Sequence, residues 1–384
     1  MVVNVVSFSG AGGAGNVAKT LAQGFLKIGY EVNLVLATKG NLHSKPFERP
    51  VLTMYAGADN YFLRKASWKT LVSLNRDRYS ALEGSLPSAD LTIFRWMNGI
   101  LGESFLKRNP NLHNLVWGLD DMNPFTGVCH YSAKCKGFET GCTTCPALRR
   151  PFEGMAAKNL RRKIQFSERF KPRYVAPTEW ILNEFKSSIL GENRESVKIL
   201  NPLQSKFFEG RRIESSKPRE LRLLIIAADL DDPTKGVWNA VASLSKIMQD
   251  QAFSLTMIGR FSKKLASRLP GAKFLGHLDS MSIIEVMRQN DVLLVPSLFE
   301  NAGTVVAEAA SQGLPTIARR VGGMPEMTNY GETGYLFSDN YQLEQLLSSV
   351  TKTEIAEKGH LALEWSQELR PEKIAARYAQ CFLG

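Results

Sequence analysis

The fold of this chain is decided by the stretch Asp291-Val-Leu-Leu-Val-Pro-Ser-Leu-Phe-Glu300-Asn-Ala-Gly-Thr-Val-Val-Ala-Glu308-Ala-Ala. It opens on a short apolar run, which is typical of a buried strand. Residues 304–312 follow as a predicted helix, which Gly313 ends. The sequence therefore predicts a strand, a loop and a helix in succession. Glu300 lies in the loop at the carboxyl end of the strand, and Glu308 lies one turn inside the helix.

The start of this predicted helix favours a bound phosphate. We expect the backbone N–H groups of Gly303, Thr304 and Val305 to point out of the helix, where the helix dipole adds partial positive charge. The two carboxylates beside them can accept hydrogen bonds from sugar hydroxyls. A nucleotide-sugar has both parts, since its diphosphate lies between two hydroxyl-rich rings. The simpler alternative is that Glu308 only complements the helix dipole and that Glu300 is a solvated loop residue.

The carboxylate spacing and the segments that follow it resemble a known enzyme family. After the Glu-x7-Glu pair come Gly313-Leu-Pro-Thr-Ile-Ala and the loop Val321-Gly-Gly-Met-Pro-Glu326. In these features the chain resembles the retaining glycosyltransferases of family 4, which have the GT-B fold. The resemblance implies that Glu300 contacts the donor sugar and that Glu308 holds the ribose hydroxyls.

A second region narrows this resemblance to a subgroup. The run Asp121-Met-Asn-Pro-Phe-Thr-Gly-Val-Cys-His-Tyr and the later Gly141-Cys-Thr-Thr-Cys-Pro are similar to transferases of bacterial exopolysaccharide synthesis, including colanic-acid-type enzymes. Trp96-Met-Asn-Gly and Pro177-Thr-Glu-Trp180 fit the same subgroup.

Two positions depart from the subgroup pattern. Where relatives read His-Asp-Met-Trp, this chain reads Asp120-Asp121-Met122-Asn123, and Arg95 stands where a His is common before the Trp. In the family the first His faces the donor sugar. Asp120 therefore indicates a different sugar, a different acceptor or lost activity.

The 384 residues are enough for two domains, and 44% hydrophobic with 22% charged residues is typical of a globular protein. Apolar runs such as 221–228 are far shorter than a membrane helix. The amino-terminal residues form a strand-like run without the regions of a signal peptide, so we expect a cytoplasmic location.

Strand and helix patterns alternate along the chain, which predicts an α/β protein with parallel sheets. We expect the GT-B arrangement, with two doubly wound Rossmann-like domains facing each other across a cleft. The predicted domains are 1–200 for the acceptor and 201–365 for the nucleotide-sugar, with a helix in 366–384 that packs back on the first domain. Pro, Ser and charged residues cluster at the boundary, in 201–218. Predicted elements are a helix at 16–29 and strands at 1–8, 31–37, 91–94, 114–117, 173–176, 221–228, 254–259, 291–295 and 315–318.

Part of the net charge of +11 is concentrated in residues 149–173, which hold nine Lys or Arg against Glu153 and Glu168. Such a segment can attract an anionic membrane surface, a polyphosphate or nucleic acid, or it is simply a solvated basic face. No nucleic-acid reader motif accompanies the charge, so we expect no nucleic-acid partner. A lipid-linked acceptor would place the protein at the inner face of the membrane.

A glycine-rich run, Gly10-Ala-Gly12-Gly13-Ala-Gly15, joins the first strand to the first helix. It satisfies the dinucleotide pattern Gly-x-Gly-x-x-Gly, which favours an NAD-dependent enzyme. The second strand, however, ends in 34–39 without the acidic residue that would bind the ribose. The family resemblance instead implies that Gly12 and Gly13 come close to the donor or acceptor. A tight turn that needs small residues is the structural alternative.

A lysine, Lys235, follows the first predicted strand of the second domain and is followed by Gly236. The family commonly uses a Lys-Gly here to neutralise the donor diphosphate, which gains negative charge as the glycosidic bond breaks. Many relatives also carry an Arg shortly before the Lys, but this loop has Asp229, Asp231 and Asp232. Arg260 is a candidate substitute, although a surface arginine is an equally good interpretation.

Four of the five cysteines cluster at Cys129, Cys135, Cys142 and Cys145. In a reducing compartment such a cluster favours metal over disulfides, and the Cys-x-x-Cys at 142–145 has the spacing of half a zinc site. A structural zinc, buried free thiols and a disulfide pair all remain open. Cys381 is interpreted as unrelated.

The resemblance implies a retaining hexosyltransferase that moves a sugar from a UDP or GDP donor to a glycan or lipid-linked saccharide in bacterial surface polysaccharide synthesis. No catalytic metal is expected, because Lys235 and the helix start can carry the phosphate charge. A non-catalytic GT-B partner subunit and an NAD-dependent enzyme are the alternatives. Candidate catalytic residues are Glu300, Lys235 and Asp121; candidate binding residues are Glu308, Gly303, Thr304, Asn301, Arg260, Gly12, Gly13 and Asp120, with Trp96 and Asn98 for the acceptor.

Overall fold

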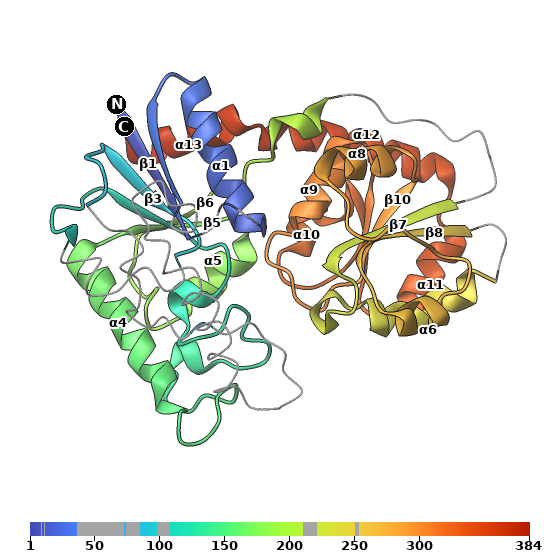
Figure 1. Cartoon of the computed structure of the whole chain (residues 1–384), viewed down its shortest axis with the longest axis horizontal. Helices are drawn as coiled ribbons and strands as arrows, with labels where there is room; N and C mark the ends of the chain where they lie inside the picture. Colours follow the sequence, from blue (N-terminus) through green and yellow to red (C-terminus); the bar gives the residue numbers. More distant parts are fainter. Residues whose placement is uncertain are drawn as a thin grey trace. The chain divides into compact units, whose positions relative to one another are not determined.

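The computed structural model divides into two compact units (Figure 1). The first unit comprises Met1–Pro202 together with Pro371–Gly384, and the second comprises Leu203–Arg370. The described residues are 1–8, 10, 12–36, 73, 85–97, 108–209, 221–249 and 253–384. No helix in these ranges is both long enough and apolar enough to cross a lipid bilayer.

The first unit is built on a sheet of six parallel strands in the order β2-β1-β3-β4-β5-β6. Every residue of β3 and β4 is buried, because helices cover both faces of the sheet. The strands are β1 (Val2–Ser7), β2 (Glu31–Leu36), β3 (Leu91–Phe94), β4 (Leu115–Gly118), β5 (Arg173–Ala176) and β6 (Ser196–Lys198).

Two helix pairs cover the two faces of this sheet. One face packs on α1 (Gly12–Lys27) and α13 (Pro371–Phe382), and the other on α4 (Gly154–Phe170) and α5 (Glu179–Lys186). On the second face, Trp117 of β4 meets Phe166 of α4 edge-on, with ring centroids 5.5 Å apart.

The helices α1 and α13 lie side by side, although they come from opposite ends of the sequence (Figure 1). A Cβ atom at Gly24 would stand 2.2 Å from the carbonyl oxygen of Pro371, so the close approach requires glycine. Phe25 and Tyr378 then pack edge to face, with centroids 6.4 Å apart. Residues 371–382 thus complete the core of the first unit.

The second unit contains another sheet of six parallel strands, in the order β12-β11-β10-β7-β8-β9. Both sheets confirm the predicted doubly wound α/β class. The strands are β7 (Leu221–Asp229), β8 (Phe253–Arg260), β9 (Lys273–Phe274), β10 (Val292–Val295), β11 (Thr316–Arg319) and β12 (Gly334–Phe337). The helices are α6 (Val237–Ile247), α7 (Lys263–Arg268), α8 (Ser280–Arg288), α9 (Thr304–Ser311), α10 (Met324–Met327), α11 (Asn340–Ser349) and α12 (Lys352–Ser366).

Each sheet has one point at which the strand order reverses. In the first unit β2 lies on one side of β1 and β3 lies on the other. The strand order therefore reverses between β1 and β3. In the second unit it reverses between β7 and β10. Ligands of open parallel sheets bind outside the carboxyl ends of the strands at such points. The fold therefore singles out one candidate edge in each unit.

Several element boundaries differ from the predicted ones. The first helix begins at Gly12 rather than at residue 16, so Gly12, Gly13 and Gly15 belong to its first turn instead of a loop before it. The second strand ends at Leu36, and residue 37 lies outside the described ranges, as does much of the predicted linker, from 210 to 218.

Candidate functional site

In the second unit, the loops after β7 and β10 meet at the reversal point. Gly236 has φ +66°, and a Cβ atom there would lie 2.0 Å from the carbonyl oxygen of Pro296. Only glycine allows this contact, which Leu298 reinforces by donating its backbone N–H to Thr234 O at 2.8 Å. The packing places Nζ of Lys235 at 2.6 Å from Oε1 of Glu300.

The Lys235–Glu300 pair is held in place but is not sealed off. Ser297 Oγ donates to Oε1 of Glu300 at 3.2 Å, and the N–H of Gly323, in the Gly-Gly loop, donates to the Glu300 carbonyl at 3.3 Å. The Glu300 side chain is 11% exposed and the Lys235 side chain 33%. The ammonium group can therefore meet an anion from solvent while its carboxylate partner stays fixed.

The aspartates that replace the family's arginine shape this loop. Asp231 accepts hydrogen bonds from the indole N–H of Trp238 at 3.0 Å and from the backbone N–H of Ser262 at 2.6 Å. Asp232 accepts the N–H of Thr234 at 2.9 Å and so caps the short 3-10 turn Pro233–Lys235. Both carboxylates thereby support the turn that presents Lys235.

Arg260 lies at the end of β8, next to the same loop. Its Nη2 is 3.2 Å from Oδ2 of Asp229, and the two side chains are 76% and 38% exposed. An ion pair with that exposure holds its partners weakly, so the guanidinium remains accessible to a ligand.

The helix α9 follows the loop that carries Glu300. Gly303 begins it with φ +36°, a backbone conformation that favours glycine, and the side chain of Met324 from the Gly-Gly loop packs against it. Thr304 is exposed at the first helical position, whereas Asn301 is buried in the preceding loop.

Glu308 lies one turn inside α9 and is mostly enclosed. Burial raises the pKa of Glu308 to about 7, while the positive charge of Lys206 acts in the opposite direction. Sequence reasoning missed Lys206, which comes from the 3-10 turn Ser205–Phe208. No motif marks it, because the contact joins segments about a hundred residues apart.

In the first unit, the two residues that depart from the family pattern meet each other. Arg95 follows β3, Asp120 follows β4, and the two form a buried ion pair with side chains 1% and 7% exposed. Arg95 also donates to Tyr378 Oη at 3.0 Å and to Asn201 Oδ1 at 2.7 Å. Burial raises the pKa of Asp120 to about 6, against the opposing effect of Arg95. A Cβ atom at Gly118 would lie 2.6 Å from Arg95 Nη1, so the arginine requires a glycine in β4.

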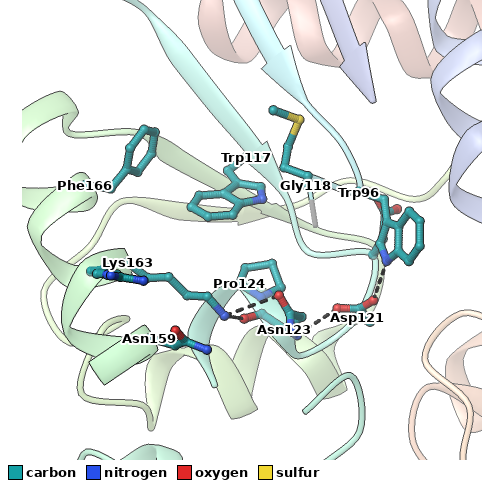
Figure 2. A pocket seen from close by; sticks show the side chains of 12 residues that line it. Trp96, Trp117, Gly118, Asp121, Asn123, Pro124, Asn159, Lys163 and Phe166 are labelled. Atoms are coloured by element: carbon teal, nitrogen blue, oxygen red, sulfur yellow. Dashed lines mark hydrogen bonds between the residues drawn. The ribbon is translucent and has the colours of Figure 1, made fainter. Parts of the chain in front are cut away.

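Asp121 is the centre of a second hydrogen-bond network, part of which Figure 2 shows. Its Oδ2 accepts the indole N–H of Trp96 at 3.0 Å and lies 2.5 Å from His130 Nδ1. Its Oδ1 accepts the N–H of Asn123 at 2.7 Å. His130 is buried, and its Nε2 is 2.8 Å from Ser73 Oγ. Sequence reasoning missed His130, although it follows Cys129 inside the motif that was used.

A small cavity lies beside this network, and Lys163 of α4 reaches along it towards Asn123 (Figure 2). Its volume is about 30 Å³, which is room for about two waters and far below the roughly 300 Å³ of a small-molecule pocket. Lys163 Nζ donates to the carbonyl oxygens of Asn123 and, at 2.9 Å, of Thr126. Burial lowers the pKa of Lys163 to about 7.

Gly12 and Gly13 lie in the exposed first turn of α1. Among the described residues, no heavy atom lies within 4 Å of the position a Cβ atom would take at either residue. Gly12 has φ +74°, which favours glycine for its backbone alone. Asn98, predicted for the acceptor, lies outside the described residues.

The clustered cysteines are all free thiols. Cys145 is buried, and the other three are partly exposed. Across the described ranges, no three Cys, His, Asp or Glu side chains surround a common point as ligands of a metal ion. The zinc assignment therefore stays a prediction.

Comparison with known proteins indicates the family to which part of the chain is similar. Residues 221–352 match the family model of the glycosyl transferases group 1. The putative colanic acid biosynthesis glycosyl transferase WcaC of Escherichia coli (strain K12) is 25% identical over 270 residues, which cover 67% of this chain and 64% of WcaC. The match thus spans less than two thirds of that relative's length.

Two solved structures establish the fold along the whole chain. HepE from Anabaena, solved in complex with UDP and glucose, superposes with a TM-score of 0.60 at 15% identity, covering 100% of this chain and 99% of that chain. WaaG, a glycosyltransferase involved in lipopolysaccharide biosynthesis, superposes with a TM-score of 0.58 at 15% identity, with coverage of 100% and 99%. The chain therefore has the GT-B fold and carries a glycosyl transferases group 1 domain over residues 221–352.

Proposed function

We propose that this protein is a retaining hexosyltransferase. It transfers a sugar from a nucleoside-diphosphate donor to a glycan or lipid-linked saccharide in bacterial surface polysaccharide synthesis. The observation that carries the proposal is the Lys235–Glu300 pair at 2.6 Å, at the strand reversal point of the group 1 domain and next to the start of α9.

Donor binding follows from the charges of the second unit. The diphosphate lies against the Lys235 ammonium and the N–H groups at the start of α9, with the exposed Arg260 within reach of the same edge. Glu308 accepts hydrogen bonds from the ribose hydroxyls, and Glu300 from a donor-sugar hydroxyl. The UDP and glucose bound by HepE support a UDP-sugar as the first donor to test.

The chemistry requires stabilisation of the leaving group. An acceptor hydroxyl oxygen bonds to the anomeric carbon on the face from which the diphosphate departs, and its proton passes to the leaving phosphate oxygen. The bond from the anomeric carbon to that phosphate oxygen breaks, and the diphosphate gains negative charge. Lys235 and the start of α9 carry this charge in the transition state more than in the ground state, which is what accelerates the step.

Acceptor recognition falls to the first unit. Trp96 offers an aromatic face for a sugar ring, and Asp121 fixes its indole by accepting the N–H at 3.0 Å. The adjoining cavity of about 30 Å³ accepts a substituent rather than a ring.

An anionic membrane surface is the proposed docking partner for this unit. The residues Lys158, Arg161, Arg162 and Arg169 of α4 are exposed, whereas Lys163 is turned inward. Each cation near an anionic surface contributes about 1 kcal/mol at most, so the four together would hold the protein reversibly. Co-sedimentation with vesicles that contain anionic lipid, compared with neutral vesicles, tests this part.

The central test is ligand binding by the purified full chain. Thermal unfolding is followed with UDP, GDP, their common sugars and NAD, for the wild type, Lys235→Ala and the control Lys246→Ala. Lys246 is a lysine of the same unit, ion-paired with Glu344 and 71% exposed. We expect one nucleotide-sugar to stabilise the wild type and the control but not Lys235→Ala. Stabilisation by NAD alone would support a dehydrogenase, and no stabilisation would support a non-catalytic subunit.

A further inference from the structure

The four clustered cysteines lie close together in the first unit. Cys129, Cys142 and Cys145 pack in one small cluster. The sulfurs of Cys135 and Cys142 lie 3.4 and 3.9 Å from the position that a Cβ atom would take at Gly137. Residues separated by up to sixteen positions are therefore gathered in one loop, residues 126–148, which we call the cysteine loop.

Backbone N–H groups point at the sulfurs of this loop. Gly137 donates to Cys135 Sγ at 3.4 Å, and Gly127 donates to Cys142 Sγ at 3.3 Å. A neutral thiol is a weak acceptor, whereas a thiolate is negatively charged and gains much more from such donors. The backbone is thus arranged to stabilise negative sulfur.

The buried amine of Lys163 lies next to the loop. The Lys163 ammonium donates its hydrogen bonds to neutral oxygens of Asn123 and Thr126. Asp121 and the thiols of Cys142 and Cys129 are the groups whose negative charge would stabilise it. A buried cation is costly unless negative charge lies near it. A set of four thiolates around a divalent cation has net charge −2, and Lys163 would offset part of that charge.

We propose that Cys129, Cys135, Cys142 and Cys145 bind one Zn²⁺ as a closed four-thiolate site, which fixes the position of His130. Four sulfurs without an open position are typical of a structural zinc site. On binding, four thiols release their protons to solvent and four Zn–S bonds form, with no change in oxidation state.

The site has a consequence for Asp121. His130 follows Cys129 directly, and its Nδ1 lies 2.5 Å from Asp121 Oδ2, the same oxygen that accepts the Trp96 indole N–H. Fixing Cys129 therefore fixes His130, and through it the carboxylate that orients Trp96. His130 acts here as a positioning residue. This second half of the inference rests on the proposed acceptor role of Trp96 and Asp121.

The first test is the metal content of the purified full chain. We expect about one zinc per chain in the wild type and in Cys381→Ser, and loss of zinc in Cys142→Ser. Cys381 is the matched control, because it is an exposed free cysteine outside the loop. Replacing zinc by Co²⁺ in the wild type should give intense sulfur-to-cobalt absorption, a signature that does not require any variant to fold. Metal-free protein without that absorption, a disulfide within the loop, or equal zinc loss in both variants would overturn the site.

The second test separates the site from the transferase proposal. A chelator is applied to the wild type, and UDP-sugar binding and acceptor KM are then measured. We expect donor affinity to stay within twofold and acceptor KM to rise several-fold, with His130→Ala reproducing the rise while keeping its zinc. Zinc present with an unchanged acceptor KM would refute the coupling to Asp121. Zinc present without nucleotide binding would leave the metal site standing and refute the transferase proposal.

Discussion

Both units carry an ion pair just beyond the carboxyl ends of their strands, and the two pairs differ in their exposure to solvent. The Arg95–Asp120 pair is 1% and 7% exposed and is tied to Tyr378 and Asn201. The Lys235–Glu300 pair is 33% and 11% exposed. A sealed pair with all its partners in the protein organises the fold, whereas a half-open pair keeps a charge available to a ligand. The first pair is thus part of the packed interior of its unit, whereas the second leaves the Lys235 ammonium accessible to a ligand.

The largest effect is expected from breaking the sealed pair. Arg95→Ala leaves Asp120 buried without its counter-charge, which should lower the free energy of unfolding by about 3–5 kcal/mol. Denaturant unfolding of the full chain measures it, with Lys235→Ala as the matched loss of one cation from the open pair. A change below 1 kcal/mol in Arg95→Ala would mean that the two pairs do not differ in this way.

The open pair should matter for activity instead. Lys235→Ala removes a cation that stabilises the leaving diphosphate, and we expect kcat to fall by about 10²–10³-fold with little change in stability. Transfer rates with a UDP-sugar measure this fall, with Lys246→Ala as the control. Equal transfer rates in Lys235→Ala and the wild type would show that Lys235 does not take part in the reaction.

A smaller effect is expected on the pH dependence of nucleotide-sugar affinity, through Glu308 of the second unit. The pKa of Glu308 is raised by burial to about 7, and hydrogen bonds from ribose hydroxyls favour the ionised carboxylate. Glu308 is protonated below pH 7, so affinity for a nucleotide-sugar should rise by about tenfold from pH 6 to pH 8. A UDP-sugar is the suitable probe, because both of its phosphates are esterified and neither titrates in this range. In Glu308→Gln the affinity should be lower and independent of pH, and a wild-type affinity without pH dependence would argue against the ribose contact.

The raised pKa of Glu308 changes stability with pH in the opposite direction to its effect on affinity. Since the folded-state pKa of Glu308 lies above its unfolded value, the folded state binds more protons between about pH 4.5 and 7. The contribution of Glu308 to stability is therefore present at low pH and is lost as the pH rises through 7. Comparing the pH dependence of unfolding for the wild type and Glu308→Gln isolates this contribution.

The smallest effect is expected at Arg260. Its ion pair with Asp229 is exposed, so Arg260→Ala should change the free energy of unfolding by less than about 1 kcal/mol. If the guanidinium contacts the diphosphate, donor affinity should nevertheless fall by about tenfold, because a charged hydrogen bond is lost. Unchanged donor affinity in a titration calorimetry experiment would make Arg260 a plain surface residue.

The sequence predicted the second unit well because its signals are local. The apolar run of β10, the glycine at the start of α9 and the carboxylates on either side lie within one stretch of twenty residues. Lys235 and Glu300 were both predicted to bind the donor, and the fold brings them together because β7 and β10 are neighbours.

The sequence could not predict which residues from distant segments lie together in the fold. Arg95 and Asp120 were noted as two separate departures from the family, and only the adjacency of β3 and β4 reveals that each compensates the other. Lys206 was missed for the same reason, since its electrostatic effect on Glu308 joins segments about a hundred residues apart. His130 lies in the same motif as Asp121, and only the fold reveals that the two side chains meet.

The packing of α13 on α1 has a consequence for how the protein is made. Phe25 and Tyr378 belong to one core, yet the ribosome must translate the whole of residues 203–370 between finishing α1 and reaching α13. At a synthesis rate of about 5–20 residues per second, this delay is on the order of ten seconds or more. The nascent amino-terminal half therefore waits with one apolar helix face uncovered and with Arg95 lacking its Tyr378 partner. The second unit, which is continuous in sequence, can fold before the first is complete.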